Sequence, residues 1–264
     1  MFSKFSQKKK WILKELFFIL LYYLVSAFFI IFFKLNYLIS ALLYLAVPSI
    51  YLSIKRPAII KKTLIFSSFF APPIVLIFNY LAHVSGAWYE PSVIGVRVLG
   101  VFPIDTFIWG FLYCYFIIVF YESFFDNDRN KKIFSHNTKK IFYVISVMLF
   151  IFCLTYIFNK DVLNIKYFYI LFVLLFFLVP TIKILYNLPL IFDKVILQGI
   201  YFLILSIIYE LTAIYNKQWH FPGKYYVGFV ELFGLKFPFE EFLWLVLAVP
   251  AVISVYEYYV DDRK

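Results

Sequence analysis

The stretch "FPFEEFLWLVLAVPAVISVYEYYV", residues 237–260, places two adjacent carboxylates, Glu240 and Glu241, at the start of a long apolar run. The run matches the roughly 20 residues that a helix needs to cross the hydrocarbon core of a bilayer. An ionisable side chain at membrane depth is energetically costly and is therefore a candidate functional group. The stretch predicts a transmembrane helix with chemistry at one end.

The composition of the whole chain is also typical of a membrane protein. Of the 264 residues, 64% are hydrophobic and only 15% are charged, whereas a soluble domain carries about 25% charged residues. We predict an all-α fold, a polytopic membrane helical bundle of about eight transmembrane helices. The expected spans are 11–33, 36–54, 63–83, 103–122, 141–158, 166–187, 195–215 and 238–259.

The net charge of +10 does not indicate a nucleic-acid partner, because Lys and Arg cluster at the ends of the spans. Most of them precede the first span or follow an even-numbered span, and such basic segments usually face the cytoplasm. We therefore predict a multi-pass protein of the cell membrane with both termini cytoplasmic. Cys114 and Cys153 fall inside apolar runs, which disfavours a disulfide framework or a thiolate metal site.

An internal repeat relates the two halves of the chain. The stretch "FPIDTFIWGFLYCYFIIVFYESFFD" (102–126) aligns without gaps with residues 237–261. The matched positions are Phe102, Pro103, Asp105, Phe107, Trp109, Tyr121 and Glu122 with Phe237, Pro238, Glu240, Phe242, Trp244, Tyr256 and Glu257. Upstream, "NYLAHVSGAW" (79–88) matches "ELTAIYNKQW" (210–219). We predict two parallel four-span repeats, 1–135 and 136–264, related by a twofold axis along the membrane normal.

The acids of the repeat define a candidate site in the outer half of the bilayer. Pro238 suits the first turn of a helix, and carboxylates that follow in that turn can simply complement the helix dipole. That explanation does not cover Glu210, which we expect one turn inside its span, or the recurrence of the acid as Asp105. Residues adjacent on a helix point about 100° apart, so only one of Glu240 and Glu241 can face a cavity squarely, and the repeat favours Glu240.

Aromatic side chains near these acids are candidates to bind an apolar substrate and to shield a cation with their π faces. The predicted substrate-binding residues are Trp244, Phe242, Trp109, Phe107, Asn79, Trp88 and Trp219. Most other aromatic residues are expected to face lipid. His83 and His220 are expected at outer loops or span ends as ordinary interface residues.

The acid motif resembles the signature of the membrane lycopene cyclase family, which is Pro-x-Glu-(Glu/Asp), then Phe or aromatics, then a distant Tyr-Glu pair. The family includes heterodimeric bacterial lycopene β-cyclase subunits, fused archaeal relatives and the cyclase domain of fungal bifunctional enzymes. Residues that match are Pro238, Glu240, Glu241, Phe242, Trp244, Tyr256 and Glu257. The first half departs from the pattern, because it has Asp105 and Thr106 at the paired acids and Asn79 in place of Glu210.

The resemblance implies an isomerase that cyclises the acyclic end of a carotenoid or similar polyene, with no cofactor and no metal. An acid protonates the terminal double bond, the carbocation closes a six-membered ring, and a base removes a proton. Glu240 would handle the proton, Glu241 and Glu210 would set its protonation, and Asp105 would contribute less. The sequence leaves open whether the protein acts as a homo-oligomer or a hetero-oligomer.

Two other functions compete with a cyclase. A non-enzymatic transporter or lipid-binding protein is disfavoured because Pro180 and Pro250 have no apparent counterparts, so no pair of spans is interrupted. A membrane prenyltransferase needs clustered Asp residues to hold Mg²⁺ and diphosphate. The candidates, Asp126 and Asp128 in one half and Asp261 and Asp262 in the other, are expected in solvated cytoplasmic loops. The Tyr-Glu pairs at 121–122 and 256–257 are expected to be interface anchors and packing residues.

Overall fold

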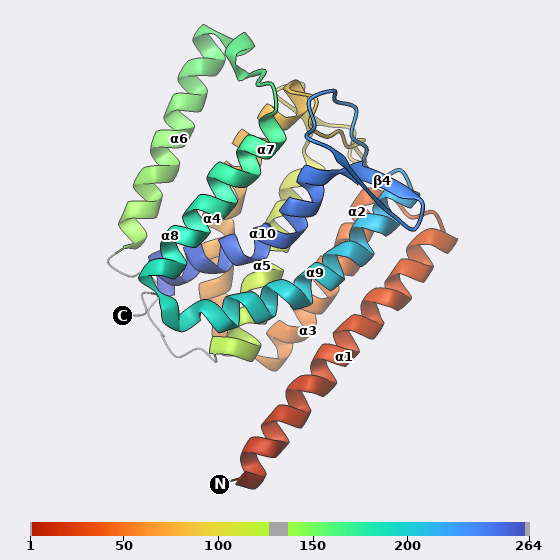
Figure 1. Ribbon diagram of the computed structural model, residues 1–264, viewed down its shortest axis with the longest axis vertical. Coiled ribbons are helices and arrows are strands. Elements are labelled where there is room, and N and C mark those ends of the chain that lie inside the picture. The colour runs from red at the N-terminus through yellow and green to blue at the C-terminus, as the bar shows by residue number, and fades with distance from the viewer. Residues whose placement is uncertain (1, 127–136, 262–264) are drawn as a thin grey trace.

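The computed structural model describes residues 2–126 and 137–261 (Figure 1). Within these ranges, eight helical segments are long and apolar enough to cross a membrane, which confirms the predicted all-α polytopic bundle. The segments are Lys10–Phe32, Tyr37–Lys55, Pro57–Val84, Asp105–Asp126, Thr138–Phe158, Phe168–Asn187, Pro189–Tyr215 and Phe239–Val260. Each overlaps one predicted span, although some ends differ by more than a turn.

The elements are mostly helical. The α-helices are α1 (Phe2–Phe32), α2 (Tyr37–Ala41), α3 (Val47–Lys55), α4 (Ile60–Val84), α5 (Asp105–Tyr121), α6 (Thr138–Phe158), α7 (Phe168–Phe172), α8 (Val179–Asn187), α9 (Phe192–Tyr215) and α10 (Phe239–Tyr256). Short π-helical turns are η1 (Leu42–Ala46), η3 (Glu122–Asp126), η5 (Val173–Leu178) and η7 (Glu257–Asp261), and 3₁₀ turns are η2 (Pro57–Ile59), η4 (Lys160–Leu163) and η6 (Pro189–Ile191). Two antiparallel hairpins join β1 (Arg97–Val98) to β2 (Phe102–Pro103) and β3 (Phe229–Leu232) to β4 (Leu235–Pro238).

The order of these elements occurs twice along the chain. Each time, the first element is a long helix and the second is a helix with a π turn in its middle. A 3₁₀ turn and a third, long helix follow, then a β-hairpin, and then a last helix that ends in a π turn. The predicted border between 135 and 136 falls outside the described residues, so the limits of the two repeats stay a prediction. We call the end of the bundle that carries both hairpins the hairpin end (Figure 1).

Residues that match in the repeat also contact one another. Tyr89 and His220 form a β-bridge, and the ring centroids of Trp109 and Trp244 are 5.7 Å apart. The tyrosine hydroxyls cross between the halves: Tyr121 donates a hydrogen bond to Glu257, and Tyr256 donates one to Glu122. Reciprocal contacts between equivalent residues are what a twofold axis produces. The three contacts lie before α5 and α10, in the first turns of these two helices, and at their ends.

Two prolines explain the π turns in the middle of the second and sixth spans. Pro48 and Pro180 have no N–H to donate within a helix. Immediately before them, Val47 and Val179 each donate to the carbonyl five residues earlier. The prediction that Pro180 has no counterpart is therefore wrong, because the frame that aligns the acid motifs does not hold upstream, where the connecting loops differ in length. A pair of spans is interrupted after all.

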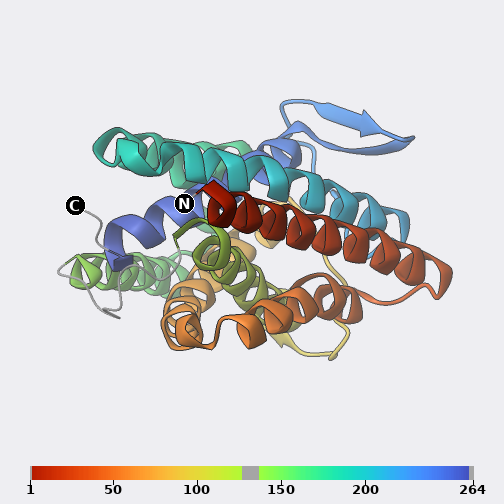
Figure 2. The ribbon, with the colours of Figure 1, turned by 90° about the horizontal axis from the view of Figure 1, so that it is seen from below.

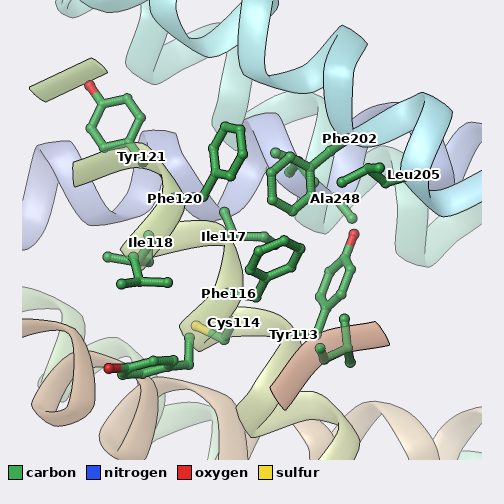
Figure 3. Close-up of a cluster of buried hydrophobic side chains, with 14 of the residues drawn as sticks. Tyr113, Cys114, Phe116, Ile117, Ile118, Phe120, Tyr121, Phe202, Leu205 and Ala248 are labelled. Carbon is green, nitrogen blue, oxygen red and sulfur yellow. The ribbon is translucent and has the colours of Figure 1, made fainter. Parts of the chain in front are cut away.

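Helix α5 lies at the centre of the bundle and has the largest buried share of the eight spans. Its side chains pack on Phe202 and Leu205 of α9 and on Ala248 of α10 (Figure 3). In the view from below, α1 lies alongside α9 (Figure 2). Helix α6 has the smallest buried share and stands at the edge, packed on α4 (Figure 1).

The Tyr-Glu pairs are buried rather than exposed at the membrane interface. Glu122 and Glu257 are at most 1% exposed, and Lys62 lies 3.2 Å from Glu122. The expectation that they anchor the protein at the interface is wrong, because the crossed contacts between the two halves enclose them. Their packing role is consistent with this position.

The Asp-rich end of the first half differs from the expected solvated loop. Asp126 is fully buried and lies 3.1 Å from Lys194 of α9. Asp128 and Asp262 lie outside the described residues. An aspartate that already binds a lysine inside the bundle is poorly placed to hold Mg²⁺ and diphosphate.

Removing the two crossed tyrosine hydroxyls should loosen the contact between the halves. We expect Tyr121→Phe and Tyr256→Phe each to lower the free energy of unfolding by about 2 kcal/mol, because a hydrogen bond to a charged acceptor is lost in a buried site. The measurement is the melting temperature of the detergent-solubilised protein. Tyr143→Phe is the control, since Tyr143 is 72% exposed, and equal melting temperatures for all three variants would contradict the role of the crossed pairs.

Candidate functional site

A cavity of about 590 Å³ lies inside the bundle, between α4, α5, α6, α8, α9 and α10. Its wall is mostly apolar and aromatic. Three carboxylates line it, Glu90, Glu210 and Glu241, and all three are at most 7% exposed. We call the part of the cavity that they line the head, and it lies toward the hairpin end. This arrangement agrees with the expected cavity flanked by carboxylates, although the set of acids differs.

Glu210 and Glu241 bring two carboxyl groups within hydrogen-bonding reach of one another at the head. Glu210 lies in the last turns of α9 and accepts a hydrogen bond from the indole Nε1 of Trp219 at 2.9 Å. Glu241 lies in the first turn of α10 and accepts a hydrogen bond from the hydroxyl of Tyr169. Each carboxyl is thus held by one aromatic donor, which leaves the remaining oxygens to the other carboxyl and to the cavity.

Glu240 does not line the cavity, and the prediction that it is the inward-facing acid is wrong. Its side chain is fully buried, and its Oε1 accepts a hydrogen bond at 2.6 Å from the backbone N–H of Val227 in the loop before β3. The helix places Glu241 on the cavity face one position later, about 100° around the axis. Glu240 therefore holds the loop of its own half.

Asp105 has the equivalent task in the first half and also does not line the cavity. It is fully buried, and its Oδ2 accepts hydrogen bonds from the backbone N–H of Val93 at 2.9 Å and from the hydroxyl of Ser92 at 3.1 Å. The backbone N–H of Ile94 binds Oδ1 at 3.2 Å. The acid that recurs in both repeats is thus an anchor for a loop, and the repeat alone could not show this.

Most of the predicted substrate-binding residues do line the cavity. These are Asn79, Trp88, Trp109, Trp219 and Trp244. Asn79 accepts a hydrogen bond from Trp88 Nε1 at 3.1 Å, which repeats the contact between Glu210 and Trp219. Beside Trp109 and Trp244, the ring of Tyr113 lies 5.2 and 5.3 Å from theirs.

Phe107 and Phe242 do not line the cavity, which corrects their prediction as substrate-binding residues. Phe107 packs on Phe102 instead, and Phe242 on Phe239. The cavity face of α10 follows the three- and four-residue spacing from Glu241 through Trp244, and Phe242 falls off that stripe. Helical phase, more than proximity to the acid, decides which aromatic residue reaches the cavity.

Sequence reasoning missed several polar residues of the cavity wall, among them Glu90, Tyr37 and Tyr169. Glu90 lies in the loop between α4 and β1 and has no acidic counterpart in the repeat, so no pattern marked it. Its Oε2 lies 2.8 Å from Nε2 of His83. His83 is therefore not an ordinary interface residue as expected, because its side chain is only 4% exposed and contacts a carboxylate of the head.

The cavity extends along α10 toward the other end of the bundle. It is lined by Glu241 near the start of that helix and by Tyr258 beyond its end, which at 1.5 Å per residue corresponds to roughly 25 Å. On its side, Val144 of α6 and Val179 of α8 line the cavity and are also 47% and 54% exposed. The cavity therefore opens laterally between α6 and α8, on the lipid-facing surface.

The loops of the two halves close over the head. The hydroxyl of Tyr226 donates to the carbonyls of Gly86 and Ala87 at 3.1 and 2.9 Å and accepts from the N–H of Gly223. Partial burial raises the pKa of Tyr226 to about 12, so its hydroxyl keeps its proton at neutral pH. Gly86 has φ +70°, and a Cβ on Gly223 would lie 2.3 Å from the Gly86 carbonyl oxygen.

Substitution of Gly223 should disturb this closure. We expect Gly223→Ala to cost about 1–3 kcal/mol, the usual penalty of overpacking, because the backbone of the facing loop must shift. Thermal melting in detergent measures the effect. Gly228→Ala is the matched control in the same loop, since nothing lies within 4 Å of the added Cβ. The close approach of the loops would be refuted by Gly223→Ala melting like the control.

Comparison with known proteins adds no relative. No protein-family model, curated protein or solved structure matches the chain. The function must therefore be inferred from the geometry of the cavity and from the acid motif.

Proposed function

We propose that this membrane protein is an isomerase that cyclises the acyclic end of a carotenoid, with Glu210 and Glu241 as its acid–base pair. One observation carries the proposal: two carboxyl groups lie within hydrogen-bonding reach of one another at the head of a cavity whose wall is otherwise mostly apolar and aromatic. Such a cavity suits a hydrocarbon, and the only chemistry that the pair can offer a hydrocarbon is proton transfer.

The contact between the carboxyls supports this role. Two carboxylates that touch in an apolar site do not both ionise, because the two charges repel, so the pair holds a proton. That proton can be given to the terminal double bond. The electrons of a second double bond then close the ring onto the carbocation, and a carboxylate removes a proton from the neighbouring carbon.

The aromatic wall supports a cationic intermediate. Trp109, Tyr113 and Trp244 stack on one another beside the head, and the face of an aromatic ring attracts a cation. No charged group is needed to hold a substrate without polar atoms. The cavity along α10 is about as long as an extended polyene, and its lateral opening would admit a molecule dissolved in the bilayer.

The pair belongs to the second half alone. Thr106 and Asn79 occupy the positions of Glu241 and Glu210 in the first half. We therefore propose one active site per chain, formed at the head of the cavity, with the first half as its scaffold. Asp105 and Glu240 hold loops and act indirectly.

Expression in lycopene-accumulating cells tests the function, with pigment chromatography as the readout. We expect the wild-type chain to form a cyclic carotenoid, and Glu241→Gln and Glu210→Gln each to lower its formation by about 10²–10⁴-fold, the usual contribution of a general acid or base. The change to an amide keeps the shape of the side chain and removes the titrating group.

Glu240→Gln is the matched control on the same helix turn. Its amide oxygen can still accept the N–H of Val227, so we expect most of the activity to remain. The opposite ranking, with Glu240 essential and Glu241 dispensable, would refute the assignment of the pair. A wild-type chain that binds lycopene and forms no product would favour a lipid-binding protein or transporter, which the paired interruptions at Pro48 and Pro180 also permit.

We also propose that the protein lies in the cell membrane with both termini cytoplasmic and the hairpin end outside, as the distribution of Lys and Arg indicates. Cysteine labelling tests this orientation in a Cys153→Ser background, because Cys114 is buried. Phe233 and Leu190 are 91% and 85% exposed, at the hairpin turn and between α8 and α9. An impermeant maleimide should label Phe233→Cys in intact cells and Leu190→Cys only after permeabilisation, and the reverse result would invert the topology.

A further inference from the structure

We propose that Glu90 and His83 form a proton relay that connects the Glu210–Glu241 pair with water at the hairpin end. The inference rests on the proposed function, because it concerns the exchange of the proton that the pair uses. Neither residue belongs to the acid motif, and neither has a titratable counterpart, since His83 stands opposite Ile214 in the repeat and Glu90 has no acidic match. Both are positioning residues here, since they act through the pair.

Glu90 is the third carboxylate of the head. Its side chain lines the same cavity as the pair and is almost completely buried. A buried carboxylate without a structural partner in the backbone needs another reason to be there, and Glu90 meets His83 on its far side.

The hydrogen bonds of His83 determine where its protons lie. Nδ1 is 2.9 Å from the backbone carbonyl oxygen of Asn79, and a carbonyl can only accept, so Nδ1 carries a proton. Nε2 then faces Oε2 of Glu90 at 2.8 Å. Both atoms are buried and lie at hydrogen-bonding distance, although neither makes an aligned hydrogen bond in the described part of the chain. A small rotation of the imidazole would let the two atoms pass a proton between them.

The surroundings place this pair between the cavity and the hairpin end. Titratable and charged groups from five elements surround it: Tyr37 (α2), Tyr89 (loop after α4), Arg97 (β1), Glu210 (α9) and Glu241 (α10). Arg97 binds the backbone carbonyl of Glu90 at 3.1 Å and the hydroxyl of Tyr89 at 2.7 Å. Tyr89 is 38% exposed and its ring lies 6.0 Å from that of His83, so the outer side of the pair is near the surface.

The chemistry gives such a relay a measurable task. In each turnover an O–H bond of the pair breaks as a C–H bond of the hydrocarbon forms, and a later C–H bond breaks as a carboxylate takes up its proton. The hydrocarbon gains and loses one proton, with no redox change. Without exchange, the recovered proton would be used again. With a relay, the pair equilibrates with water between turnovers, and the added proton comes from solvent.

Deuterium incorporation distinguishes the two cases. Membrane vesicles that hold the full chain and lycopene are incubated in D₂O, and the cyclic product is analysed by mass spectrometry for deuterium per ring. We expect the wild type to introduce one deuterium per ring. His83→Gln and Glu90→Gln should still form the ring, because the pair can use the recovered proton again, and their product should be mostly unlabelled.

Two controls separate the relay from a structural role. His220→Gln changes the exposed histidine that forms the β-bridge with Tyr89, the neighbour of Glu90 in the chain, and should leave the label at the wild-type value. Glu90→Asp keeps a carboxyl and should restore labelling relative to Glu90→Gln. If Glu90→Gln does not fold, His83→Gln alone decides.

The outcomes are distinct. Labelling at the wild-type level in the product of His83→Gln or Glu90→Gln would overturn the relay and leave the cyclase intact, as would a wild-type product without deuterium. A wild-type chain that makes no cyclic product would instead refute the proposed function, and the relay with it.

Discussion

The fold depends on one constraint: a polar group inside a bilayer has to be satisfied by another part of the protein. The buried acids of the bundle meet it in different ways. Glu122 contacts Lys62 and Tyr256, and Asp126 contacts Lys194. Asp105 and Glu240 bind the backbone of loops. These contacts join helices that are far apart in sequence, and they fix the ends of α5 and α10, the helices that run beside the twofold axis.

Glu210 and Glu241 meet the same constraint in another way. Each has one aromatic donor, and the rest of each carboxyl faces the other acid and the cavity. A lysine at the same place would neutralise the charge and prevent the proton transfer that we propose. Two acids that share a proton satisfy one another and still hold a proton that can be transferred. The free-energy cost of burying Glu210 and Glu241 is therefore linked to the proton transfer that we propose for them.

Much of the fold could be predicted because hydropathy reports directly on the bilayer. All eight spans follow from apolar length. The site was harder to predict, because adjacent residues of a helix differ by about 100° and hydropathy does not give the rotation of a helix. For this reason the predictions that Glu240 and Phe242 face the cavity are wrong, whereas their neighbours Glu241 and Trp244 do line it. Glu90 could not be found at all, since its place depends on how a loop folds over the head.

The repeat explains why the wrong acid was chosen. A motif that recurs in both halves marks what both halves need, and both need a carboxylate to hold the loop before the last helix. The chemistry that we propose is needed once, and the residues proposed for it differ between the halves: Glu241 where the other half has Thr106, and Glu210 where it has Asn79. In a duplicated fold, similarity between the halves therefore points to the scaffold, and a departure from that similarity at a shared cavity points to the site.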